Sequence, residues 1–412
     1  MASTLLIQLQ RPNGSWVDVG LLNNDGSRNT FDFLSSYWEI SDRPILGQIF
    51  EEHGKRWNPS THVALPRWFS HLLPEGPMRL AVAQAAEIHP DREFELIRRL
   101  GLDDLPGAVR AQPVSSEGVI IAAAEQAEEY SGGDSDPLLK FSLAGAQLKY
   151  SLFSDGRGLT IPAKGTAGNV IAKLPDTRHG FDGVPEAEFA AMRLAASSGI
   201  DTASVRLARV GDIQGFEDWG LWVGNEPILV VDRFDRLAND IRIHMEEIAQ
   251  VIDIPTRQNN SKYKHANYET VAMLVASFVG VDAVASVIDR LVFNILIGNG
   301  DAHLKNWAFL YEDGYNAALS PAYDIVPTIL YMSADDMGLN LNGTKSFTSI
   351  DFQSFDGMGR RTDFGVSEAR RQVRSAVERV LENWGALEEL LPAHQFNRLT
   401  VRLKTLPLAG LV

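Results

Sequence analysis

The 412-residue sequence contains no cysteine. This absence excludes disulfide bonds, thiolate metal sites and cysteine nucleophiles, and it fits a reducing compartment. Long hydrophobic runs are also missing, and residues 1–14 lack the basic and apolar regions of a secretory signal. The sequence therefore predicts a cytoplasmic protein that has no association with a membrane.

Positive charge is scarce. The chain has 38 Lys and Arg against 53 Asp and Glu, a formal net charge of -15. Such a field repels a phosphate backbone, so direct binding of nucleic acid by the whole protein is disfavoured, although a basic partner could supply that contact. The hydrophobic share of 45% is that of an ordinary globular protein. The length exceeds what one core fills and predicts two or more sub-domains.

The chain begins with short alternating segments and continues with helical spacing. "TLLIQLQ" and "WVDVGLL", separated by the turn signal "RPNGS", predict a meander of strands. Residues 65–86 and 91–102 carry apolar side chains at intervals of three and four, which is typical of helices. We place the boundary of a first sub-domain near residue 110, so that it comprises residues 1–110.

Strand-like runs then resume, and helices dominate the last part. "KYSLF", "NVIAKLP", "ASVRLARV" and "EPILVVDRF", with a helix over residues 185–200, predict a second sheet within residues 111–234. Residues 235–412 carry helical patterns, which include 245–252, 268–279, 283–298 and 368–391. This segregation predicts an α+β protein with two lobes and a cleft between them.

A polar string interrupts one of the most apolar regions. "GNGDAHLKN", residues 298–306, lies between "RLVFNILI" and "WAFLY". Asp301 and Asn306 are five positions apart, a separation at which a compact loop can turn both side chains towards one point. Asp324 follows eighteen residues later in "SPAYDIVP" and offers a third oxygen ligand.

Lys173 lies inside the apolar strand "NVIAKLP", where its ammonium group needs an anionic partner. Glu188 on the following helix could supply it. Taken singly, Lys173 also fits a snorkelling edge-strand lysine, and Glu188 fits a solvated helix residue. Together with Asp301, Asn306 and Asp324 they form the parts of phosphoryl transfer. One Asp deprotonates a hydroxyl, Asn306 and Asp324 hold Mg²⁺, and Lys173 binds nucleotide phosphates.

Two further features extend this interpretation. The hairpin-like stretch 141–153 has the small residues Ala144, Gly145 and Ala146, which would let backbone amides approach a phosphate. Taken by itself the stretch favours a plain β-hairpin turn, and its position before "NVIAKLP" favours the phosphate role. His303 is expected to shape the loop or to touch the nucleotide. A zinc site is disfavoured because no His-x-x-x-His pairing occurs.

These blocks resemble the HipA family of serine/threonine kinases, the toxin components of HipBA-type toxin–antitoxin systems. The resemblance spans nearly the whole chain and includes "LPRWFSHLLPEGPMR", "DDLPGAV", "FSLAGAQLKYSL", "NVIAKLP", "EAEFAAMRLAASSGI", "VVDRFDR", "SKY", "LIGNGDAHLKN" and "LSPAYDIVP". It implies a bilobed, protein-kinase-like fold, with an extra N-terminal sub-domain, a mixed N-terminal lobe and a mostly helical C-terminal lobe.

The resemblance also implies roles for single residues. Asp301 would be the catalytic Asp, and Lys173 would contact the phosphates of ATP. Asn306 and Asp324 would hold the magnesium ion. The hinge near the adenine would comprise Asp232, Arg233 and Phe234, where Asp232 departs from the Glu that family members often carry.

The same resemblance implies regulation and partners. Ser142 occupies the place of an autophosphorylation site, and a phosphate there would repel those of ATP. The expected partner is a HipB-like helix-turn-helix antitoxin, through which alone the protein would reach DNA. The expected substrate is a cytoplasmic protein, with an aminoacyl-tRNA synthetase such as glutamyl-tRNA synthetase as the known type of target.

Two other functions share the local motif. An aminoglycoside- or choline-kinase-like phosphotransferase also carries an Asp with Asn five residues later, but it lacks the "LLPEG" and "AGAQ" blocks. A non-catalytic kinase fold that acts as a co-repressor would have lost some of the transfer groups, and here all of them are present.

Overall fold

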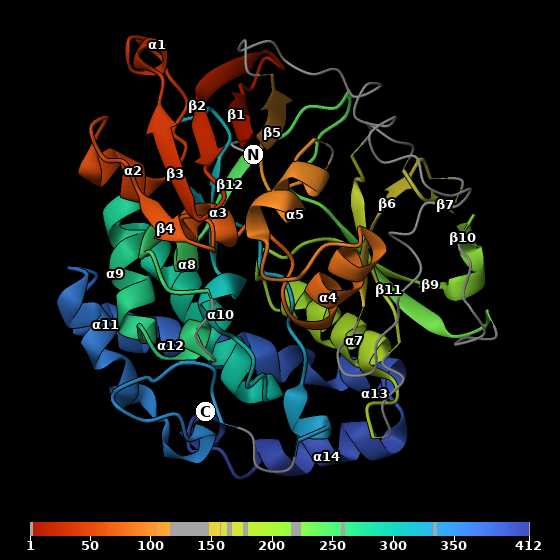
Figure 1. Ribbon diagram of the computed structural model, residues 1–412. Coiled ribbons are helices and arrows are strands. Elements are labelled where there is room, and N and C mark those ends of the chain that lie inside the picture. Colours follow the sequence, from red (N-terminus) through yellow and green to blue (C-terminus); the bar gives the residue numbers. More distant parts are fainter. Residues whose placement is uncertain are drawn as a thin grey trace.

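The computed structural model describes residues 3–102, 104–115, 148–156, 158–162, 167–175, 180–215, 224–256, 260–332 and 336–411. Over these residues the chain forms three sheets, two in the N-terminal half and a small one within the helical C-terminal half (Figure 1). The predicted α+β class and two-lobed architecture are confirmed.

The first sheet is antiparallel and has the order β4-β3-β2-β1-β5. The two predicted strands at its start are confirmed, with left-handed glycines in both turns, at Gly14 and Gly26. Its strands are β1 (Ser3–Gln10), β2 (Trp16–Asn24), β3 (Arg28–Phe33), β4 (Ser60–His62) and β5 (Val109–Val114). The helices around it are α1 (Ser35–Trp38), α2 (Gln48–His53), α3 (Arg67–Ser70), α4 (Gly76–Ala85) and α5 (Glu93–Leu100).

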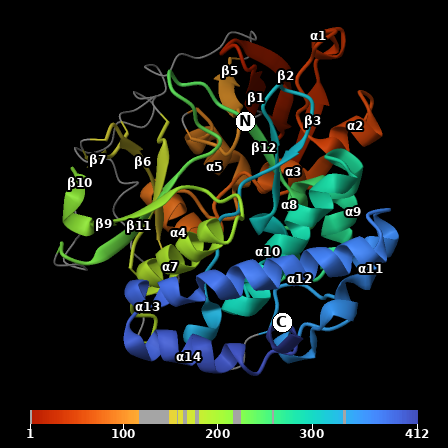
Figure 2. The ribbon, with the colours of Figure 1, turned by 180° about the vertical axis from the view of Figure 1, so that it is seen from behind.

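The second sheet has the order β10-β7-β6-β8-β11-β9 and is antiparallel except between β10 and β7. Its strands are β6 (Lys149–Ser154), β7 (Leu159–Thr160), β8 (Val170–Lys173), β9 (Val205–Arg209), β10 (Ile213–Gln214) and β11 (Pro227–Asp232). Helix α7 (Val184–Ser197) runs alongside β11 and β9 (Figures 1 and 2).

The two faces of this sheet have different neighbours. In the register, Lys173 of β8 opposes Lys149 of β6 on one side and Leu229 of β11 on the other. Because side chains alternate along a strand, these three share one face, and Leu229 packs there into the core of α7 and the helical lobe. Ala172 and Tyr150 lie on the opposite face, in a separate small core that α4 contacts.

The C-terminal lobe is built around a helix that is buried on nearly all sides. This is α10 (Val284–Ile297), which ends at Gly298 in a left-handed conformation. A Cβ at Gly298 would lie 2.6 Å from Ile329, so glycine is required where the helix turns into the polar loop. The other helices are α8 (Ile248–Val251), α9 (Tyr268–Phe278), α11 (Asp356–Arg361), α12 (Val366–Asn383), α13 (Leu387–Leu390) and α14 (Ala393–Leu403).

The helix predicted over residues 245–252 is wrong in its first half. The segment forms strand β12 (His244–Glu247) followed by the single turn α8. β12 pairs with β13 (Ala308–Tyr311), which pairs with β14 (Ala318–Leu319). Pairing with a strand that is distant in sequence overrides the local helical spacing, because it directs Glu246 into the interior.

The first sub-domain is fastened to the helical lobe by buried polar contacts. The carboxylate of Glu246 accepts hydrogen bonds from the amide of Gln48 (3.1 Å), Nε1 of Trp68 (3.1 Å) and the hydroxyl of Tyr311 (2.9 Å). Two buried histidines also bridge the two parts, as His71 contacts the carbonyl of Ile254 and His244 contacts that of Leu46. Among the described residues, no helix has the length and apolar composition needed to cross a bilayer.

Candidate active site

A buried lysine lies at the junction of the two lobes. Lys173 is the last residue of β8, an interior strand of the sheet, and it is 4% exposed. Its Nζ pairs with Oε1 of Glu188 on α7 and with Oδ1 of Asp324. Glu188 is fully buried. The snorkelling and solvated alternatives are therefore excluded, and the ion pair expected between Lys173 and Glu188 is present.

A second lysine contacts the same aspartate. Nζ of Lys149 lies 3.2 Å from Oδ1 and 3.1 Å from Oδ2 of Asp324. Burial alone would raise the pKa of Asp324, but the charges of Lys149 and Lys173 hold it well below its usual value. Burial likewise opposes the charge of Lys173, yet Asp324 and Glu188 raise its pKa. Both Lys173 and Asp324 are therefore charged at neutral pH.

The backbone of Asp324 is unusual for a residue other than glycine. Its φ is 59°, in the left-handed region. Asp adopts this region more readily than most residues because its short polar side chain can form local hydrogen bonds. The Asp324 carboxylate contacts Lys149 and Lys173, which both belong to the sheet of the N-terminal lobe.

Hydrogen bonds within the loop after α10 fix its shape. The side-chain oxygen of Asn299 accepts from the amide of Asp301 (3.0 Å), and the amide of Gly300 donates to Oγ1 of Thr328 (2.7 Å). Nδ2 of Asn306 donates to the carbonyl oxygen of Asp301 (2.8 Å). The separation of five residues is thus closed by a direct contact between Asp301 and Asn306.

The Asp301 side chain is half-exposed and has protein partners on one oxygen. The hydroxyl of Tyr263 donates to Oδ1, and Nε2 of His303 lies 3.8 Å from the same atom. Burial raises the pKa of Asp301, and the charge of nearby Asp324 adds to that effect. Burial lowers the pKa of His303 to about 3, so its ring is neutral at physiological pH.

Lys305, in the loop that follows α10, also contacts the first sub-domain. Nζ of Lys305 pairs with Glu75 (3.0 Å) and with Glu247 (3.4 Å). Glu75 immediately precedes α4, and Glu247 ends β12. Burial disfavours the charge on Lys305, but Glu247 and Glu75 raise its pKa. Lys305 thereby links the loop to the turn before α4 in the first sub-domain and to the end of β12.

The predicted hinge residues have three different environments. Asp232 is exposed and pairs with Arg206 at 3.0 Å. Arg233 is buried, donates to both oxygens of Asp235 (2.9 Å each) and contacts Asp104 of the first sub-domain. Phe234 packs against Tyr323, with ring centroids 5.5 Å apart. The side chain of Arg233 therefore joins sub-domains.

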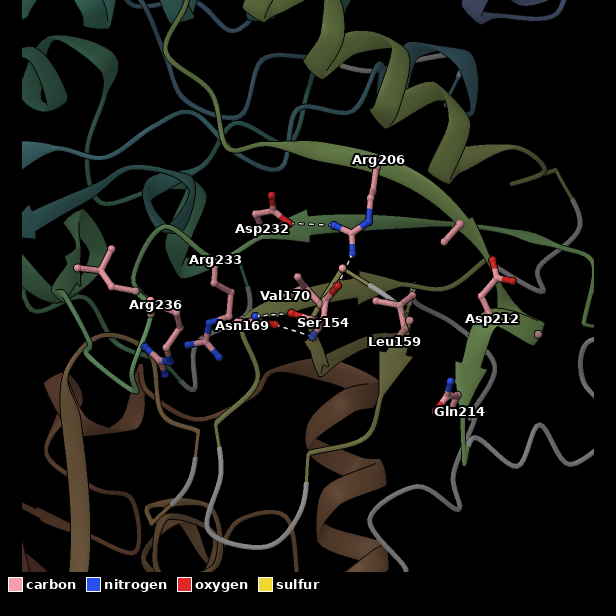
Figure 3. A pocket seen from close by; sticks show the side chains of 16 residues that line it. Ser154, Leu159, Asn169, Val170, Arg206, Asp212, Gln214, Asp232, Arg233 and Arg236 are labelled. Carbon is pink, nitrogen blue, oxygen red and sulfur yellow. Dashed lines mark hydrogen bonds and ion pairs between the residues drawn. The ribbon is translucent and has the colours of Figure 1, made fainter.

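A cavity of about 1080 Å³ lies beside the predicted hinge, because Asp232 and Arg233 are among the residues that line it (Figure 3). Val170, Arg206 and Asp232 line it, and the Arg206–Asp232 pair crosses its wall. Val170 and Lys173 are three positions apart on β8, so their side chains point to opposite faces of the sheet. The cavity is thus separate from the cluster around Lys173.

Two family models cover most of the chain. Residues 15–112 match the HipA N-terminal domain, and residues 141–384 match the HipA-like C-terminal domain. This chain belongs to the HipA family.

Related proteins and structures agree with this assignment. The HipA-family chain is 37% identical over 381 residues to the protein Y4dM of Sinorhizobium fredii, and the matched region covers 90% of each chain. It is 25% identical over 409 residues to the serine/threonine-protein kinase toxin HipA of Shewanella oneidensis, covering 88% of this chain and 86% of that one. The HipA–HipB–operator DNA complex of Shewanella oneidensis matches with a TM-score of 0.72 at 20% identity, covering 98% of this chain and 97% of the other. The fold is that of HipA.

Some predicted positions of this HipA-family chain lie outside the described residues, namely Ser142, Ala144, Gly145 and Ala146. Conversely, the structure adds two residues that the sequence interpretation overlooked. Lys149 lies between the buried Leu148 and Tyr150, so its side chain points to the opposite face of the strand. The register of β6 with β8 places it opposite Lys173, and this register would have identified it. Tyr263 carried no signal beyond its place in the "SKY" block.

Proposed function

We propose that this HipA-family protein is an ATP- and Mg²⁺-dependent serine/threonine protein kinase. The observation that carries the proposal is the buried Lys173 held between Glu188 and Asp324, beside the loop of Asp301 and Asn306. A lysine fixed by a helix glutamate, a loop Asp and two oxygen ligands are the groups that phosphoryl transfer requires.

Each group has a role in the proposal. Lys173 and Lys149 are the cations that bind the phosphates of ATP. Asp301 accepts the proton of the acceptor hydroxyl, for which its half-exposed carboxylate is available. Phe234 and the main chain at Asp232 and Arg233 form the adenine side of the site, since the Arg233 side chain is engaged elsewhere.

The residues present fit a magnesium ion. Asp324 and Asn306 offer a carboxylate and an amide oxygen, which are hard ligands of the kind Mg²⁺ prefers, and the amide nitrogen of Asn306 is the atom used within the loop. Among the described residues, no group of three His, Asp or Glu could hold a metal by itself. A magnesium ion that enters with the nucleotide needs only one or two protein ligands, and it would neutralise phosphate charge.

The proposal includes regulation. A phosphate on Ser142 would stand beside those of ATP, and like-charge repulsion would lower nucleotide affinity. Ala144, Gly145 and Ala146 would cover the phosphates, and His303, neutral and buried, would support the loop next to the nucleotide.

We further propose that the kinase is the toxin of a toxin–antitoxin pair. A HipB-like helix-turn-helix antitoxin would be its partner and would supply its contact with DNA, which suits a chain of net charge -15. The relationship to a HipA toxin and the fold of a HipA–HipB–DNA complex support this partner. The substrate would be a cytoplasmic protein, with an aminoacyl-tRNA synthetase such as glutamyl-tRNA synthetase as the first candidate.

The test is transfer from radiolabelled ATP with Mg²⁺ to purified synthetases, to sugars and to choline, with and without Asp301→Asn. The wild type is expected to label a protein, and Asp301→Asn to bind ATP within about tenfold of wild type while transfer is lost. Asp42→Asn, an exposed aspartate of the first sub-domain, is the matched control.

The other outcomes decide between the rival functions. Label on small molecules alone would identify a small-molecule phosphotransferase. ATP binding without any transfer would identify a non-catalytic co-repressor, and full activity of Asp301→Asn would refute the assigned base.

A further inference from the structure

Tyr263 occupies a place that the proposed roles leave unexplained. It ends the short helix η3 (Ser261–Tyr263), and its phenolic hydroxyl donates a hydrogen bond to Oδ1 of Asp301. The residue that would receive the acceptor's proton is thus already held at one oxygen by a neighbour from another segment.

Two contacts besides the bond to Asp301 keep Tyr263 there, and one of them is made by Lys345. Its ring meets that of His303 edge-on, with centroids 5.1 Å apart. Nζ of Lys345 donates to the carbonyl of Tyr263 (3.1 Å) and to that of Gly338 (2.8 Å). The tyrosine is therefore fixed between the catalytic loop and the segment that follows Asp324.

The contact leaves part of Asp301 accessible. The Asp301 side chain is 48% exposed, and its contacts with Tyr263 and His303 are both to Oδ1, which leaves Oδ2 for an incoming group. A carboxylate rotates easily about its last bond unless something holds it. A fixed donor on one oxygen determines where the other oxygen points.

We propose that Tyr263 is a positioning residue that holds Oδ1 of Asp301, so that Oδ2 faces the hydroxyl of the protein acceptor. This inference rests on the proposed kinase function. In the transfer, the acceptor oxygen bonds to the γ-phosphorus of ATP, the bond from that phosphorus to the β,γ-bridging oxygen breaks, and ADP leaves. The hydroxyl proton passes to Oδ2 of Asp301.

The phenol is suited to this task because its hydroxyl donates to the carboxylate and keeps its proton. Burial and the charge of Asp301 raise the pKa of Tyr263 well above its ordinary value, so the hydroxyl keeps its proton and does not compete as a base. A donor that stays neutral orients the carboxylate and leaves its negative charge in place. A lysine at the same position would neutralise that charge.

The test is Tyr263→Phe, which retains the ring and its contact with His303 and removes only the hydroxyl. With Mg²⁺, radiolabelled ATP and the dephosphorylated chain itself as acceptor, we expect kcat to fall about 10- to 100-fold, since small misplacements of a reacting group have effects of this size. The KM for ATP and the affinity for ADP are expected to be unchanged. Tyr315→Phe, at an exposed tyrosine, is the matched control and should behave as wild type.

A second substitution separates the hydrogen bond from packing. Incorporation of 4-aminophenylalanine at position 263 restores an N–H donor on the same ring and is expected to recover activity relative to Tyr263→Phe. A kcat of Tyr263→Phe within twofold of wild type, or a rise in the KM for ATP at constant kcat, overturns the role of Tyr263 and leaves the kinase function intact. Wild-type protein that transfers no phosphate to any protein, itself included, overturns both.

Discussion

Removal of the Glu246 carboxylate is predicted to loosen the first sub-domain from the helical lobe. In Glu246→Ala, the Gln48 amide, the Trp68 indole and the Tyr311 hydroxyl lose a shared acceptor. A buried donor without a partner costs about 1–3 kcal/mol, so three of them set a loss of at least about 3 kcal/mol. We therefore expect the free energy of unfolding to fall by at least about 3 kcal/mol.

Glu246→Gln is the matched variant, because it retains the shape and one carbonyl oxygen. Burial raises the pKa of Glu246 to about 7. A carboxyl whose folded-state pKa is raised stabilises the protein below its unfolded value of about 4.5, and that stabilisation is lost as pH rises through 7. The wild type should therefore lose up to about 3 kcal/mol across this window through Glu246, and Glu246→Gln should lack this contribution.

Urea unfolding followed by tryptophan fluorescence measures both effects, since Trp68 is at the contact. A Glu246→Ala chain whose free energy of unfolding lies within about 1 kcal/mol of wild type would refute the reasoning, because donors left buried cannot be that inexpensive. Equal pH dependence of wild type and Glu246→Gln would refute the raised pKa.

Two further predictions concern other buried ionisable groups. Lys173→Met should leave Glu188 buried without its cation, and the double variant Lys173→Met/Glu188→Leu should be more stable than Lys173→Met by about 1–4 kcal/mol in thermal unfolding; a double variant that is less stable would contradict this. Burial lowers the pKa of His71 to about 3 and that of His244 to about 4, so the stability of these neutral rings is present above pH 6.5 and is lost as pH falls towards those values. His244→Asn should therefore flatten the decline in the free energy of unfolding between pH 6.5 and 4, and an unchanged slope would argue against it.

The sequence was informative where local pattern and final environment coincide. The alternation of residues 4–10 predicted β1, and the apolar run before Gly298 predicted α10, because each element meets the core with the face its pattern specifies. Lys173 was identified by the energetic difficulty of a lysine in an apolar strand, a local argument that needs only an anionic partner.

Pairing between distant segments limited the rest. The helical spacing of residues 245–252 was overridden by pairing with β13, more than sixty positions away. The sequence around Arg233 gives no signal for its contact with Asp104. Lys149 required knowledge of strand register. The hydroxyl of Tyr263 could be placed on Asp301 only once the fold had brought the two segments together.

The contact between Glu75 and Lys305 has a consequence for how this chain can be divided. Glu75, in the turn before α4, pairs with Lys305 of the loop that contains Asp301, although the loop belongs to the helical lobe and the turn to the first sub-domain. A fragment that began after the first sheet would leave Lys305 paired with Glu247 alone. It would also expose the side of β12 that contacts the first sub-domain through Glu246. Residues 1–110 thus support the candidate active site, and we expect that neither part can be exchanged between relatives without the other.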